Sequence, residues 1–103
     1  MKYVIKVNIL QEMTEVFPDN ANAMNSYSWR MTELKKNLED ALFKAKMGVE
    51  LANEDMKPMI LDTQAEVEWL LGDKESAIHS IKEAIKLDAE NDYYLSQLEK
   101  FEE

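Results

Sequence analysis

The sequence predicts a single all-α domain of about six helices. Three observations favour this fold class: apolar residues recur at spacings of three and four along most of the chain, only 2 Gly and 2 Pro occur among 103 residues, and one helical pattern appears twice. A β-sandwich or barrel needs a turn about every 8–12 residues, which calls for more turn-forming residues than this chain has. The length suits one hydrophobic core and is too short for two.

The first three helices are predicted over residues 3–17, 21–34 and 38–52. The first follows the helical period, although the alternation at its start would also suit a short strand. It should end before Pro18, because proline disfavours helical geometry in the residue that precedes it. Asp19 or Asn20 can then cap the second helix, and Asn37 is placed to cap the third.

The last three helices are predicted over residues 59–71, 74–87 and 92–103. Pro58 is tolerated in the first turn of a helix. Gly72 follows the fourth helix, where glycine accommodates the left-handed conformation, and Asp73 can cap the fifth. Such short connections predict that helices adjacent in sequence pack antiparallel.

The third and fifth helices repeat each other at an offset of 36 residues. The matched positions are Leu42, Ala45, Gly48, Val49 and Leu51 in one copy and Ile78, Ile81, Ala84, Ile85 and Leu87 in the other. A helix-turn-helix unit with a period in the thirties is typical of solenoids, because a single hairpin cannot bury both of its faces.

Residues 61–91 resemble the tetratricopeptide repeat (TPR), whose period is about 34 residues. The matches are Ala65 in the first helix, Leu71-Gly72-Asp73 at the turn, and Ala77, Ile81 and Ala84 in the second helix. The resemblance implies a right-handed α-solenoid with an N-terminal helix at 1–17, repeats at 21–53 and 58–91, and a C-terminal cap helix at 92–103. The segments Ser28-Trp29-Arg30 and Leu61-Asp62-Thr63 are also similar to the C-terminal helical extensions of some bacterial thioredoxin-fold proteins.

The sequence departs from the TPR pattern at Gln64 and Glu68, where the family usually has large apolar residues. A lone carboxylate is costly to bury. We therefore expect Glu68 either to be exposed or to pair with a cation, for which Arg30 on the neighbouring repeat is the best candidate.

The chain is acidic, with a formal net charge of −9. The charge is uneven, since residues 1–57 carry 8 basic and 9 acidic side chains whereas residues 58–103 carry 4 and 12. Such a chain repels nucleic acid and anionic membranes, so we expect neither as a partner. A basic partner would be attracted to the second half, although an acidic surface also serves solubility alone.

We expect no enzymatic activity, no metal site and no cofactor. The chain has no Cys, a single His and no glycine-rich phosphate loop. His79 falls at a repeat position that faces solvent, without an oriented partner beside it. Asp62 and Glu66 could be read as an acid-base pair or a calcium site, but the spacing of a calcium-binding loop is missing, and a solvated or groove-lining face is the better interpretation.

By the geometry of the family, the first helix of each repeat lines a concave surface. This predicts a binding site for a peptide or protein segment formed by Asn25, Trp29, Asp62, Glu66 and Trp69. The tryptophans would anchor the segment and the carboxylates would select Lys or Arg, so the partner is expected to be basic or neutral. Alternatively, either tryptophan fills the gap between hairpins.

The alternative function is structural, as the C-terminal or self-association domain of a larger protein. The N-terminal helix then offers Tyr3, Val7 and Leu10 for homodimerisation. Its apolar stretch is too short for a membrane span and lacks a signal-peptide cleavage site. We expect a cytoplasmic location, or an extracytoplasmic one if the chain is part of a larger exported thioredoxin-like protein.

Overall fold

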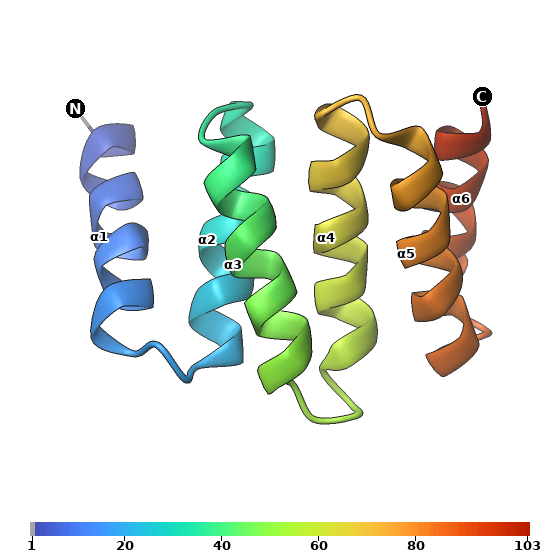
Figure 1. Ribbon diagram of the computed structural model, residues 1–103, viewed down its shortest axis with the longest axis horizontal. Coiled ribbons are helices and arrows are strands. Elements are labelled where there is room, and N and C mark those ends of the chain that lie inside the picture. The colour runs from blue at the N-terminus through green and yellow to red at the C-terminus, as the bar shows by residue number, and fades with distance from the viewer. Residues whose placement is uncertain (1) are drawn as a thin grey trace.

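A computed structural model describes the backbone from residue 2 to residue 103 and the side chains from residue 9 onward. Over this part of the chain the structure is all helical, which confirms the predicted fold class and helix number (Figure 1). The helices are α1 (Lys2–Val16), α2 (Ala21–Leu34), α3 (Leu38–Leu51), α4 (Lys57–Leu70), α5 (Lys74–Leu87) and α6 (Asp92–Glu102). None of these described helices is both long and apolar enough to cross a membrane.

The helix ends follow from local chemistry. The Asn20 side chain caps α2 by accepting a hydrogen bond from the backbone N–H of Ala23 at 3.0 Å, and Asp73 caps α5 in the same way. Gly72 has a φ of +89°, the left-handed conformation that glycine adopts without strain. Asn37 differs from the prediction, because it precedes α3 with a φ of 52° and its side chain makes no cap hydrogen bond.

The helices form two stacked hairpins with an additional helix at each end. Helix α2 packs on α3, and α4 packs on α5, while α2 also contacts α4 and α4 contacts α6. Figure 1 shows the resulting row, in which α1 and α6 lie at opposite ends of the long axis. The molecule measures 35 × 28 × 19 Å along its principal axes.

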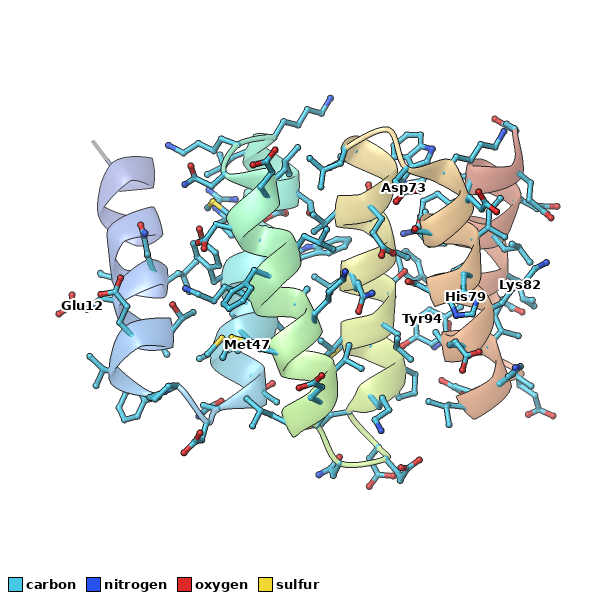
Figure 2. The ribbon with its side chains drawn as sticks, viewed as in Figure 1. Glu12, Met47, Asp73, His79, Lys82 and Tyr94 are labelled. Atoms are coloured by element: carbon cyan, nitrogen blue, oxygen red, sulfur yellow. The ribbon has the colours of Figure 1, made fainter. Side chains whose placement is uncertain are left out.

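The core consists of two clusters. One lies among α4, α5 and α6 and contains Leu61, Ala65, Ala77, Ile81, Ala84, Tyr94 and Phe101. The other contains Tyr27, Met31, Ala41 and Val67, with Leu10 of α1 packed against it. Figure 2 shows Tyr94 on α6 beside α5, and it shows His79 on α5, where the side chain is exposed as its repeat position predicts.

Small residues let the hairpins approach closely. At Gly48, a Cβ atom would lie 3.1 Å from Cγ2 of Ile60 and 3.2 Å from Cβ of Met24, so α3 meets both α2 and α4 there. Within the first hairpin, Ser28 lets α2 approach α3, and its buried hydroxyl donates to the carbonyl oxygen of Ala41 at 2.9 Å. This hydrogen bond satisfies a polar group that would otherwise be costly to bury.

The prediction that Glu68 is either exposed or paired with a cation is wrong on both points. The residue is 4% exposed, and its carboxylate accepts hydrogen bonds from the Ser80 hydroxyl at 2.6 Å and the Gln64 amide at 3.2 Å. Arg30 pairs instead with Glu33 on its own helix at 3.0 Å. Neutral donors on α4 and α5 therefore hold a buried carboxylate for which the sequence suggested a cation.

Candidate functional site

An open groove with a volume of about 690 Å³ crosses the first helices of the two hairpins. It is lined by Ile9 and Leu10 of α1, Asn25, Ser26, Trp29, Arg30 and Glu33 of α2, Met59, Asp62 and Thr63 of α4, and Tyr93 of α6. Helices α2 and α4 lie in contact, so they form a continuous floor between α1 and the start of α6. The groove thus has the concave, several-helix construction of a binding site.

Apolar side chains at the groove remain accessible to solvent. Ile9 is 51% exposed, Met59 is 42% exposed and Tyr93 is 49% exposed, and all three line the groove together with the half-buried Trp29. Exposed apolar surface gathered in a hollow differs from single apolar residues scattered over a protein, and it is typical of ligand or partner sites. An occupant could bury it.

The structure brings together three of the five residues predicted for binding. Asn25 and Trp29 reach the groove from α2, and Asp62 reaches it from α4. Glu66 and Trp69 follow on α4, but they lie against α6 and do not line the groove. The predicted set is therefore divided between an open site and a helix-helix contact.

Helix α6 contacts Glu66 and Trp69 closely. The Lys100 ammonium lies 2.7 Å from a Glu66 oxygen and 4.5 Å from the centre of the Trp69 ring. The Gln97 amide donates to Glu66 at 2.9 Å, and the Phe101 ring centre lies 5.8 Å from that of Trp69. A carboxylate and an indole on α4 thus already bind a cation, which the chain itself supplies.

Asp62 lies one helical turn before Glu66 and is 5% exposed. The Gln97 amide donates to its carboxylate at 3.1 Å, so one amide nitrogen bridges Asp62 and Glu66. Burial raises the pKa of Asp62 to about 6, and the charge of Glu66 adds to this effect while Gln97 and Lys100 oppose it. The carboxylate is consequently ionised at neutral pH at an energetic cost.

Asn25 contributes a further acceptor to the groove. Its Oδ1 atom is buried, and the residues whose side chains are described provide no hydrogen-bond donor for it. An amide can exchange the places of its oxygen and nitrogen by a half-turn about its terminal bond. Asn25 can therefore offer an oxygen to a donor that enters the groove.

Most of the groove residues were not predicted as site residues from sequence, among them the exposed Ile9 and Tyr93. Ile9 lies beside Leu10 on a second, exposed apolar stripe of α1 that also contains Met13 and Val16, and such a second stripe is a sequence signal of a surface site. Tyr93 precedes the buried Tyr94 at the start of α6. Its place at the groove depends on how α6 folds back on α4, which local sequence patterns do not reveal.

The groove is lined by apolar, aromatic and polar side chains. Throughout the described part of the chain, no group of three or more His, Cys, Asp or Glu residues is arranged to hold a metal ion.

No protein-family model and no curated protein sequence matches the chain. The residues of the groove therefore carry the functional interpretation.

Proposed function

We propose that this protein is an interaction module that binds an extended peptide or protein segment, basic or neutral in charge, in the groove along α2 and α4. The observation that carries the proposal is the open groove that the exposed side chains of Ile9, Met59 and Tyr93 line together with Trp29. Aromatic residues and Met are enriched at the centres of protein interfaces, where a few of them supply most of the affinity. The protein acts by holding its partner and performs no chemistry of its own.

We further propose that the helices form a right-handed TPR-like solenoid. The pairing of α2 with α3 and of α4 with α5 supports this, as do the contacts between successive first helices. The buried small residues Ala45, Gly48, Ala65 and Ala84 lie at repeat positions where helices of that family cross. Such a solenoid uses its first helices to present an extended concave surface, which is the surface that the groove occupies.

Selection from a displayed library of random linear peptides tests the proposal. The wild-type protein should enrich a peptide family, and Trp29→Ala and Met59→Asp should each weaken binding of the selected peptides by at least about tenfold. Phe43→Ala is the matched control, because Phe43 is 62% exposed and does not line the groove. Circular dichroism should show that all variants stay folded.

Failure of the wild-type protein to enrich any peptide would argue against this function. Another contrary result would be selected peptides whose affinity is reduced by Phe43→Ala but is unchanged by Trp29→Ala and Met59→Asp. Binding would then occur on another face of the protein. Fluorescence polarisation with labelled peptides gives the dissociation constants for both comparisons.

A second candidate function, self-association, is favoured by an apolar stripe on α1. Ile9, Met13 and Val16 lie at helical spacing on one face and are 51%, 38% and 59% exposed. Of the residues first proposed for a dimer, Leu10 packs inward, while the side chains of Tyr3 and Val7 lie outside those that the structure describes. A dimer would therefore use the exposed stripe.

Sedimentation velocity over a concentration series distinguishes the two functions. A self-associating protein should shift to a larger species at high concentration, and Met13→Glu with Val16→Glu should abolish that shift by placing charge on the stripe. A protein that remains monomeric at every concentration while it binds selected peptides would exclude self-association as its role.

A further inference from the structure

We infer that the segment bound in the groove carries an arginine side chain whose guanidinium group pairs with Asp62. The inference rests on the proposed function and specifies the chemistry of the occupant. Three observations lead to it. A neutral donor compensates the buried charge of Asp62, further acceptors line the same groove, and the same helix already contains a site that binds a cation.

Asp62 is a buried carboxylate compensated by a neutral donor. It is 5% exposed, and the hydrogen bond that it accepts comes from the Gln97 amide. Lys100, whose charge partly opposes the rise in the pKa of Asp62, bonds to Glu66 at 2.7 Å. A buried charge is stabilised fully only by an opposite charge together with hydrogen bonds. An occupant that brings a cation to Asp62 would supply the missing part.

The groove that Asp62 lines contains further hydrogen-bond acceptors. The Oδ1 atom of Asn25 has no donor among the described side chains, and Glu33 adds a second carboxylate. The one cation that lines this groove among the described residues is Arg30, which Glu33 holds at 3.0 Å. A guanidinium carries five N–H donors in a planar fork, so it can serve two acceptors simultaneously.

Aromatic rings favour arginine over lysine at this position. Trp29 and Tyr93 line the groove from α2 and α6, and the planar guanidinium stacks on aromatic faces while it donates from its edge. One turn later on α4, Glu66 and Trp69 bind a cation of a different kind, the ammonium of Lys100. Asp62 lines the groove together with Trp29 and Tyr93, and there the partner would provide the cation.

Peptide selection on matched variants tests the inference at neutral pH. The wild-type protein should enrich peptides with one arginine at a fixed distance from their apolar residues. Asp62→Asn should lose the arginine enrichment and keep the apolar preference, whereas Glu33→Gln, which removes the same charge from the same groove, should retain both. Enrichment of lysine in place of arginine, or arginine enrichment that persists in Asp62→Asn, would overturn the assignment.

A peptide substitution tests the pair without altering the protein. Replacing the selected arginine by glutamine should weaken binding to the wild-type protein by at least about tenfold, as expected for a buried charged pair, and should have little further effect on Asp62→Asn. Equal losses in both proteins would show that the arginine contacts another group. This double-mutant cycle remains informative even if Asp62→Asn lowers the stability of the protein.

The pH dependence of binding provides an independent readout. Affinity of the wild-type protein for the arginine peptide should fall as the pH drops below the pKa of Asp62, which is about 6 in the free protein, and Asp62→Asn should remove this dependence. The other charged or titratable groups at Asp62 are Glu66 on its own helix, Arg30 and Glu33 from α2, and Tyr93, Tyr94 and Lys100 from α6. Burial raises the pKa of Tyr93 and Tyr94 further above this range, and Glu33→Gln controls for the exposed carboxylate.

The selection separates failure of this inference from failure of the proposed function. Peptides that require Trp29 but contain no arginine would refute the role of Asp62 and leave the binding groove intact. A wild-type protein that enriches no peptide would refute both. A flat pH profile for an arginine peptide would also exclude Asp62 as its partner.

Discussion

The ammonium group of Lys100 lies 2.7 Å from the carboxylate of Glu66, and this ion pair attaches α6 to α4. The same lysine lies over the Trp69 ring, and the neighbouring Phe101 packs against that ring. The last helix thus covers two residues that the sequence suggests for partner binding. Stability of the C-terminal end and access to this part of α4 should therefore depend on the same few contacts.

Lys100→Met should lower the free energy of unfolding by about 1 kcal/mol. The lysine is 37% exposed, so its ion pair is partly screened by solvent and contributes less than 1 kcal/mol, with a similar contribution from its contact with Trp69. Urea denaturation of the single variants and the double variant with Glu66→Gln measures the coupling. Lys86→Met is the control, because Lys86 pairs with Glu83 on one helix and is 73% exposed. A coupling energy of zero between Lys100 and Glu66 would contradict the prediction.

Phe101→Ala should destabilise the protein by about 3–5 kcal/mol, a large part of the stability of a domain this size. The ring is 0% exposed and fills the cluster among α4, α5 and α6. Hydrogen exchange should then show early opening of α6. Leu95→Ala on the same helix should cost much less, because Leu95 is 42% exposed. Similar losses from both variants would mean that α6 is not held through Phe101.

Helix boundaries could be predicted because each has a local cause. Pro18 ends the first helix, Gly72 has the left-handed conformation that its position suggests, and Asp73 caps α5. Asn37 was the exception, since the backbone there turns left-handed and directs its amide toward the sulfur of Met31. A capping residue type identifies a helix start but does not fix the conformation that precedes it.

The site was predictable only in part, because its limits depend on contacts between distant residues. The resemblance to the tetratricopeptide repeat predicts that Asn25, Trp29 and Asp62 lie on one surface of the first helices, and all three line the groove. Gln97 meets Asp62 across 35 positions of sequence, and that contact depends on how α6 docks. Periodicity identifies the face of a helix but not which part of that face another helix covers.

Gly48→Leu should destabilise the protein by about 1–3 kcal/mol, whereas Gly48→Ala should be nearly neutral. A Cβ atom at this position would lie 3.1 Å from Ile60 and 3.2 Å from Met24, and a leucine would force α3 away from both. In Gly48→Ala, the higher helix propensity of alanine offsets part of the crowding. Thermal unfolding of both variants measures the difference. A stable Gly48→Leu protein would show that the hairpins are more loosely packed than the structure indicates.

Asp62→Asn should make the protein more stable at neutral pH, by up to about 3 kcal/mol, and this advantage should disappear as the pH falls toward about 4. Burial raises the pKa of Asp62 from 3.8 to about 6, so the folded protein binds the proton more tightly than the unfolded chain does. As the pH falls from about 6 to about 4, protonation of Asp62 therefore stabilises the folded wild-type protein relative to the unfolded chain. Asparagine is neutral at every pH and gains no such stability. Denaturant unfolding across this pH range tests the difference.

Asp73→Asn serves as the control of opposite sign. The hydrogen bond from Ser76 lowers the pKa of Asp73, so its stabilising effect is present above its unfolded pKa and is lost as the pH falls through its folded pKa. The wild-type protein should be more stable to unfolding than Asp73→Asn at neutral pH, and this difference in stability should become smaller in acid. If both variants changed with pH in the same direction, the assignment of the Asp62 shift to burial would be wrong.

Ser80→Ala should destabilise the protein by about 1–3 kcal/mol, whereas adding Glu68→Leu should restore or exceed wild-type stability. The Ser80 hydroxyl donates to Glu68 at 2.6 Å in a buried contact between α5 and α4, so removing it leaves a buried carboxylate oxygen without this donor. Replacing both partners by apolar groups removes the carboxylate and the hydroxyl together, and among the described residues only the half-buried Gln64 amide loses its acceptors. The change also introduces the kind of residue that the resembled repeat family has at this position. Chemical denaturation of the two single variants and the double variant measures the effect. A double variant less stable than Ser80→Ala alone would show that the Glu68 carboxylate contributes net stability to the hairpin.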